Sequence, residues 1–330
     1  MADFTPQTTL RQVRKTPEFA EFSQFIMFCN EDPADDPVNP GLDPEDFTLK
    51  SDPVSHCIDG LNTLRDNVRK GVAVSHDIYT ADEKAASPDK NNTNLLFFPG
   101  ERGKPFVLIC AGGGYATVCS FLEGYPVAAQ LNRMGYNAFV LSYRVNEVGL
   151  LPRPTEDVAA ALRYIFSHAR EFGVSTEGYA VAGFSAGGHV AGSWGTDYLG
   201  YPRFGLPRPG AIILCYGASR VANDEKSHSI FWRMVGDHPD PQLVKAVNVT
   251  ENVTSHYPPT FVWQCKDDKL VHYSASVQMD KALEAAGVPH QLRLYEKGGH
   301  GIGLADHTDA AGWLEDAVNF WQSVTNQTNF

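Results

Sequence analysis

The chain has 330 residues, of which 43% are hydrophobic and 20% are charged, ordinary values for a globular protein with a large core. The formal net charge of −12 argues against nucleic acids and anionic membrane surfaces as partners, because both attract basic patches. No uninterrupted apolar run is long enough to cross a bilayer, so we expect no transmembrane helix.

Residues 1–67 differ in pattern from the rest of the chain. An aromatic-rich stretch is followed by a loop rich in proline and aspartate, EDPADDPVNPGLDPEDF. We interpret this part as an N-terminal extension, with a lid or the contact of a homodimer as its candidate roles and a simple wrap around the domain as the alternative. The first fifteen residues lack the apolar core of a secretory signal, and we expect a cytoplasmic protein. Cysteines in apolar runs, such as Cys110, Cys215 and Cys265, suit a reducing compartment.

From about residue 68 onward, short apolar runs alternate with longer amphipathic ones. Most of the short runs are apolar throughout, which is typical of strands covered on both faces. The expected strands are residues 71–80, 93–100, 105–114, 137–144, 178–185, 211–217, 260–267 and 290–299, with a polar loop between the first two.

The expected helices cover residues 123–135, 155–173, 273–287 and 309–324. Gly135, Gly173 and Gly287 end three of them, and Thr155 is the expected N-cap of the second. Strands and helices that alternate in this way predict an α/β domain over residues 68–330, with a doubly wound, mostly parallel sheet and helices on both faces. A polar stretch around residues 218–257 reads as an insertion. Ligands of such sheets bind beyond the carboxyl ends of the strands.

The motif GFSAG places Ser185 between Gly183 and Gly187, where an expected strand meets the start of a helix. A serine in a glycine-rich run is usually only a flexible turn. At a tight strand-to-helix corner, however, tiny neighbours give clearance and the hydroxyl is exposed above the sheet. We therefore predict that Ser185 is a nucleophile.

A serine nucleophile needs a base and a carboxylate that orients the base, in the chain order serine, acid, histidine. His300 follows the last expected strand in a glycine-rich loop. Two aspartates, Asp267 and Asp268, follow the strand before it; we favour Asp268 and keep Asp267 as the alternative. His189, one helical turn after Ser185, is the nearer histidine, but we interpret it as a structural residue.

Backbone N–H groups must bind the oxyanion that forms when a serine attacks a carbonyl. We expect them at Ala186, which follows the serine, and at Gly113 and Gly114, which follow the strand at residues 105–114. A phosphate-binding loop is the competing interpretation of these glycines, and neither nucleotide-loop spacing is present.

Other polar and aromatic residues also lie near the carboxyl ends of expected strands. Tyr115 and Tyr216 are candidates for lining a substrate pocket, with core packing as the alternative. Arg144 and Asp157 flank the segment after a strand, and we expect an ion pair there, with substrate binding as the alternative. We expect no metal site and no cofactor.

The chain resembles the α/β-hydrolase superfamily in five motifs: CAGGGY, AFVLSYRV, GFSAGGHVAG, PPTFVWQCKDDKLVHYSAS and LYEKGGHGIGLA. The motifs are similar to those of serine esterases of the acetyl-xylan-esterase-like and feruloyl-esterase-like branch, near the prolyl-oligopeptidase catalytic domain. The resemblance implies a triad of Ser185, Asp268 and His300, with oxyanion donors at Gly113, Gly114 and Ala186.

The same resemblance implies a serine carboxylesterase that hydrolyses esters of small acyl groups, acetyl first, without a cofactor. Two alternatives stay open at this point. One is a serine peptidase of the prolyl-oligopeptidase type, and the other is a non-catalytic binding protein on the hydrolase fold.

Overall fold

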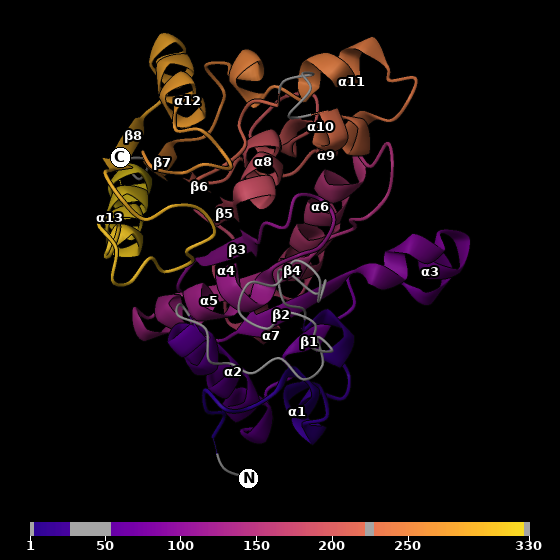
Figure 1. Cartoon of the computed structure of the whole chain (residues 1–330). Helices are drawn as coiled ribbons and strands as arrows, with labels where there is room; N and C mark the ends of the chain where they lie inside the picture. Colours follow the sequence, from indigo (N-terminus) through magenta and orange to yellow (C-terminus); the bar gives the residue numbers. More distant parts are fainter. Residues whose placement is uncertain (1–2, 27–53, 222–227, 327–330) are drawn as a thin grey trace.

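The computed structural model describes residues 3–26, 54–221 and 228–326, which Figure 1 shows in colour. Within these residues, one sheet has the strand order β1-β2-β4-β3-β5-β6-β7-β8. Its strands are β1 (Ser75–His76), β2 (Asn94–Phe98), β3 (Phe106–Cys110), β4 (Asn137–Ser142), β5 (Ala180–Phe184), β6 (Ala211–Cys215), β7 (Thr260–Cys265) and β8 (His290–Tyr295).

Strands β3 to β8 run parallel to one another, and β2 runs antiparallel to both of its neighbours, β1 and β4. This confirms the doubly wound, mostly parallel sheet that the sequence predicts. The carboxyl ends of β3 to β8 therefore meet along one edge of the sheet, which is where such folds bind ligands.

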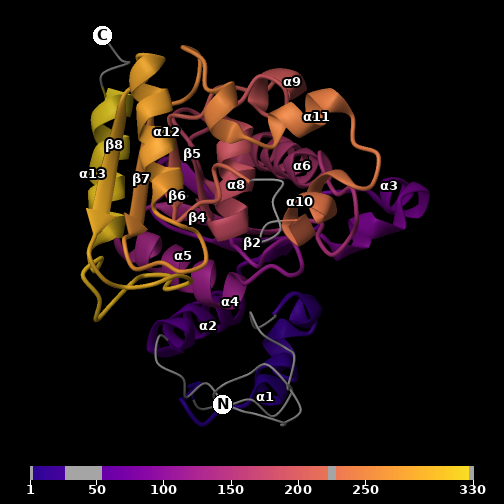
Figure 2. The same ribbon diagram turned by 45° about the horizontal axis from the view of Figure 1, so that its top comes forward.

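Helices cover both faces of the sheet, as Figures 1 and 2 show from two directions. Helices α5 (Tyr125–Arg133) and α13 (Trp313–Asn326) pack on one face, and α2 (Val54–Arg69) packs against α5 on the same side. Strand side chains such as Val107 and Ile109 belong to this core. Helices α6 (Arg153–Ser167), α8 (Ser185–Trp194) and α12 (Ser274–Ala285) pack on the other, with side chains such as Leu108. Successive residues of a strand point to opposite faces, so uniformly apolar strands supply both cores.

Shorter helices occupy the connections. They are α1 (Leu10–Arg14), α3 (Ala81–Ala86), α4 (Ser120–Glu123), α7 (Ala169–Phe172), α9 (Tyr201–Phe204), α10 (His228–Val235) and α11 (Pro241–Ala246), together with the 3₁₀ turns Pro17–Phe19, Ser23–Phe25, Pro88–Asn92 and Val249–Asn252. Among the described residues, none of the helices combines the length and the apolar character needed to span a membrane.

Several local expectations are wrong. The strand expected over residues 71–80 is only Ser75–His76, and the helix expected over residues 155–173 is divided at His168 into α6 and α7. The polar loop expected after Thr80 contains a helix, because the Thr80 hydroxyl accepts from the Glu83 N–H while the Glu83 carboxylate accepts from the Thr80 N–H. Thr155 does not cap α6, which starts earlier, at Arg153; the Thr155 hydroxyl instead donates to the Pro152 carbonyl. A proline in the first turn favours this earlier start.

The extension and the insertion are described only in part. Helix α2 of the extension packs against α5 and α4, and its His56 contacts Asp306, in the loop after His300. The proline- and aspartate-rich loop lies outside the described residues. Between β6 and β7, the described residues form α10, α11 and a 3₁₀ turn. The lid and dimer-contact interpretations of residues 1–67 stay predictions.

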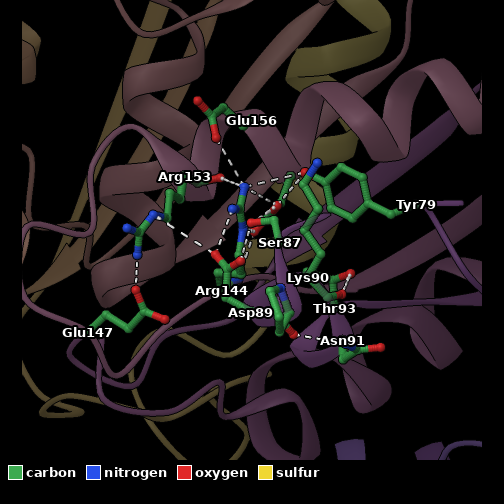
Figure 3. A network of polar contacts seen from close by, with 12 residues as sticks. Tyr79, Ser87, Asp89, Lys90, Asn91, Thr93, Arg144, Glu147, Arg153 and Glu156 are labelled. Atoms are coloured by element: carbon green, nitrogen blue, oxygen red, sulfur yellow. Dashed lines mark hydrogen bonds and ion pairs between the residues drawn. The ribbon is translucent and has the colours of Figure 1, made fainter. Parts of the chain in front are cut away.

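Arg144, two residues after β4, is buried at the centre of a polar network, as Figure 3 shows. Its Nε lies 2.9 and 3.1 Å from the two carboxylate oxygens of Asp157, which also accepts from the Arg144 backbone N–H at 2.7 Å. Asp89 and Glu156 bind the remaining guanidinium nitrogens at 2.9 and 3.1 Å. Tyr79 donates to Asp157 at 2.6 Å. The network joins the end of β4 to the start of α6, so the expected ion pair is present.

His189, on α8, is fully buried between two hydrogen-bonding partners. Its Nε2 lies 2.7 Å from the Val247 carbonyl and must carry the proton, because a carbonyl only accepts. Its Nδ1 lies 2.7 Å from the Tyr115 hydroxyl, which therefore donates to it. Burial lowers the pKa of the His189 imidazole to about 4, and the Val247 carbonyl opposes this shift. At neutral pH, His189 is a neutral residue that connects α8 to the loop after β3 and to the insertion.

Arg144→Ala should lower the free energy of unfolding by about 3–5 kcal/mol, because it leaves Asp157 buried without its cation. Urea denaturation at pH 7 measures the change. The matched control is Arg153→Ala, whose side chain is 36% exposed beside Glu147 and whose loss should cost about 0–1 kcal/mol. Equal losses from the two variants would show that the network contributes no more than a surface ion pair.

The free energy of unfolding should fall as the pH drops from 6.5 toward 4. Between these pH values the unfolded chain binds a proton at His189 and the folded chain does not. With a folded pKa of about 4, the full effect is about 3 kcal/mol. Urea denaturation across this range should show a shallower pH slope for His189→Asn than for the unchanged protein. His256→Asn, at an exposed histidine, controls for the loss of one imidazole. An unchanged slope in His189→Asn would contradict this assignment.

Candidate active site

Ser185 lies at the corner between β5 and α8. Its backbone φ is 52°, a value that residues other than glycine rarely adopt. The flanking residues must be glycines, because a side chain at either position would clash with nearby backbone. A Cβ on Gly183 would lie 2.1 Å from the Gly187 carbonyl oxygen, and a Cβ on Gly187 would lie 2.1 Å from the Cys110 carbonyl oxygen. The corner is therefore tight, and the start of α8 lies against the carboxyl end of β3.

The loops after β7 and β8 bring an acid and a histidine to this corner. His300 Nε2 lies 2.8 Å from the Ser185 hydroxyl, and His300 Nδ1 lies 2.7 Å from Asp268 Oδ2. Asp268 is 3% exposed and Ser185 is 8% exposed, so both residues are buried. The structure thus brings together the three residues that the sequence analysis favours.

The two neighbouring aspartates have different partners. Asp268 Oδ1 accepts from the backbone N–H groups of Leu270 and Val271, at 2.9 and 3.0 Å. Asp267 does not contact His300; its carboxylate accepts from the N–H groups of Gly298 and Gly299, in the loop that leads to the histidine. These hydrogen bonds, the one from Gly299 first, lower the pKa of Asp267.

Gln264, on β7, is a part of the site that the sequence analysis did not identify. It is fully buried, and its amide nitrogen donates to Asp268 Oδ2 and to the Val271 carbonyl, both at 2.7 Å. The Ser276 hydroxyl donates to its amide oxygen at 2.7 Å. A buried amide in an otherwise apolar strand is the one signal in the sequence that could have indicated it.

The loop after β3 passes directly over the corner. A Cβ on Gly112 would lie 2.8 Å from the Ser185 Cβ, so only glycine fits there without a shift. Gly113 and Gly114 have φ values of 126° and 60°, which favour glycine. Ala186 is the second residue of α8, so its N–H has no acceptor within the helix. The three proposed oxyanion donors therefore belong to two backbone segments that meet beside Ser185.

Tyr115 and Tyr216 are both buried, and their hydroxyl groups bind protein groups. The Tyr115 hydroxyl donates to His189, while the Tyr216 hydroxyl donates to Glu123 at 2.8 Å. The Tyr216 ring also packs against the His300 ring, with centroids 4.9 Å apart. Both hydroxyl groups are therefore bound within the protein, as the core-packing interpretation of these tyrosines expects.

Glu123, the last residue of α4, is a second residue that the sequence analysis did not identify. Its carboxyl group is 3% exposed and accepts from the Gly112 N–H at 2.6 Å. Burial raises its pKa; the hydrogen bonds from Gly112 and Tyr216, and the nearby His300, act in the opposite direction. Local sequence could not indicate this contact. Glu123 begins the helix expected over residues 123–135, where an acidic residue is ordinary.

An imidazole between a serine hydroxyl and a buried carboxylate can take the serine proton and make the oxygen nucleophilic. Backbone N–H groups beside that serine can stabilise a negative oxygen. Within residues 3–26, 54–221 and 228–326, no three His, Cys, Asp or Glu side chains come together as a metal site would require.

Two family models match parts of the chain. A model of the prolyl oligopeptidase family matches residues 152–328, and a model named BD-FAE matches residues 96–199. The chain is similar to an endo-1,4-β-xylanase B of Butyrivibrio fibrisolvens and to an acetylxylan esterase of Xylanibacter ruminicola. Each is 29% identical over 66% of this chain. The chain spans only 35% and 45% of the lengths of these two relatives.

A solved structure, the acetyl ester-xyloside bifunctional hydrolase from Caldicellulosiruptor lactoaceticus, superposes with a TM-score of 0.65 at 29% identity. The match covers 76% of this chain and 96% of that one. The sheet and its helices are those of the α/β-hydrolase fold, which solved neighbours share. Since one family model covers more than half of its residues, the chain belongs to the prolyl oligopeptidase family and has the α/β-hydrolase fold.

Proposed function

We propose that the protein is a serine carboxylesterase that hydrolyses esters of small acyl groups, with acetyl the first expected. The observation that carries the proposal is the continuous hydrogen-bonded path from the Ser185 hydroxyl through His300 to the buried Asp268. Esterases among the relatives support the same reaction class.

In the proposed reaction, the Ser185 oxygen attacks the ester carbonyl while His300 Nε2 takes its proton. Asp268 holds the imidazole in the required tautomer and stabilises the imidazolium. The N–H groups of Ala186, Gly113 and Gly114 bind the oxyanion. The carbon–oxygen bond to the alcohol then breaks, and the alcohol leaves with the proton from His300.

The acyl group stays on Ser185 as an ester until water attacks it, again with His300 as the base. The second tetrahedral intermediate breaks down to the carboxylic acid and the free serine. The chemistry needs only the enzyme, the ester and water, so the proposal includes no cofactor.

The acyl and alcohol preferences rest on the relatives alone. One relative is named an acetylxylan esterase, and one solved structure is titled an acetyl ester-xyloside bifunctional hydrolase. A panel of acetylated sugars, feruloyl esters and p-nitrophenyl esters of increasing acyl length should give the highest kcat/KM for acetyl esters. A higher kcat/KM for long acyl chains would overturn the acyl assignment.

A serine peptidase is the second candidate, because the family model over residues 152–328 is that of prolyl oligopeptidases. Peptide amides with proline before the scissile bond, assayed beside the ester panel, separate the two activities. A third possibility, a binding protein without catalysis, predicts that a fluorophosphonate probe leaves Ser185 unlabelled.

Ser185→Ala should lower kcat for p-nitrophenyl acetate by about 10⁴-fold or more, because the nucleophile is lost. Asp268→Asn should lower it by about 10³–10⁴-fold, because the imidazole loses its orienting charge. Asp267→Asn is the matched control at the neighbouring position. It should stay within about tenfold, because an amide oxygen can still accept from Gly298 and Gly299.

Circular dichroism of each variant checks that the fold is retained. Retention of most activity by folded Ser185→Ala would show that another group is the nucleophile. A larger loss for Asp267→Asn than for Asp268→Asn would exchange the roles of the two acids.

A further inference from the structure

The carboxyl group of Glu123 connects two loops that come from distant parts of the chain. On one side its Oε2 accepts from the N–H of Gly112, the residue before the proposed oxyanion donors. On the other side its Oε1 accepts from the Tyr216 hydroxyl at 2.8 Å. That hydroxyl accepts in turn from the Gly303 N–H at 3.1 Å, in the loop that carries His300.

The path from Gly112 to Gly303 is buried and short. Glu123 is 3% exposed and Tyr216 is fully buried, so water does not compete for these hydrogen bonds. Tyr216 directly follows β6 with a φ of 39°, and its ring packs against the His300 ring. A Cβ on Gly303 would lie 2.6 Å from the Leu122 carbonyl oxygen, so α4 and the histidine loop also touch directly.

The position of Gly112 determines where the oxyanion donors lie. Gly112 approaches Ser185 so closely that a Cβ would meet the serine Cβ at 2.8 Å. Its N–H is bound to Glu123, and its carbonyl accepts from the Cys119 N–H at 2.9 Å. An error of about 1 Å in the placement of such groups can cost about 10²-fold in rate.

We propose that Glu123 is a positioning residue. It fixes the position of the loop after β3 relative to the loop after β8, through the Gly112 N–H on one side and the Tyr216 hydroxyl on the other. This inference rests on the proposed function, because it concerns the same site. It assigns Glu123 no contact with the substrate. The opposing interpretation is a buried acid that contributes only to stability.

Three variants separate the two interpretations. Glu123→Ala removes both acceptors, while Glu123→Gln keeps the shape and an oxygen that can accept from Gly112. Tyr216→Phe removes only the hydroxyl that links Glu123 to Gly303. The matched control is Tyr179→Phe, which removes a buried hydroxyl bonded to the Pro207 carbonyl at the opposite end of β5.

The measurements are kcat and KM for p-nitrophenyl acetate, together with the Ki of an aryl trifluoromethyl ketone. Serine hydrolases add to this ketone and form a tetrahedral oxyanion, so its Ki reports how well the transition state is bound. Thermal unfolding of each variant reports stability separately.

Glu123→Ala should lower kcat by about 10²-fold, change KM by less than about threefold, and raise the Ki of the ketone in proportion to the lost kcat/KM. Glu123→Gln should recover kcat to within about tenfold of the unchanged protein. Tyr216→Phe should lower kcat by about tenfold, whereas Tyr179→Phe should leave it unchanged even if it lowers the melting temperature.

Unchanged kcat in folded Glu123→Ala would overturn the proposal, as would a Ki that does not follow kcat/KM. If Glu123→Ala does not fold, Tyr216→Phe decides: a kcat equal to that of Tyr179→Phe overturns the proposal, and a selective loss supports it. Failure of the proposed function looks different, because the unchanged protein would then neither hydrolyse the panel nor react with a fluorophosphonate.

Discussion

The close packing of the start of α8 against the end of β3 is the constraint on which the site depends. A Cβ on Gly187 would lie only 2.1 Å from the Cys110 carbonyl oxygen, so only glycine fits there, and Ser185 takes a left-handed conformation at the same corner. The same close approach brings Gly112 over the serine. One steric condition thus places the hydroxyl and the loop with the proposed oxyanion donors next to each other.

Buried polar side chains hold each loop that reaches this corner. Gln264 donates to Asp268, Glu123 accepts from Gly112, and His189 accepts from Tyr115. Each anchor lies on, or at the end of, a regular element, so rigid parts of the fold hold segments that would otherwise be free. Such anchors are costly to leave unpaired, which makes the loop positions well defined.

Much of the architecture could be predicted because its signals are local. The apolar runs of β2 to β7 are buried at every position, and the glycines of GFSAG are where a tight corner needs them. The errors at Thr80 and Thr155 are also local, and they arise where a capping box or a proline outweighs general composition. Helix α2 was not predicted, although its Cys57, Ile58, Leu61 and Leu64 recur at helical spacing and form its buried face.

The sequence by itself determined the corner at Ser185 and the order serine, acid, histidine, because short-range sterics and chain direction set both. Only the tertiary structure decided that Asp268, and not Asp267, contacts His300, because adjacent carboxylates differ only in the direction in which the folded loop turns them. It also decided the partners of Glu123. The hydrogen-bond partners of a buried carboxyl group can come from distant parts of the chain. Tyr216, which donates to Glu123, lies 93 residues away along the sequence.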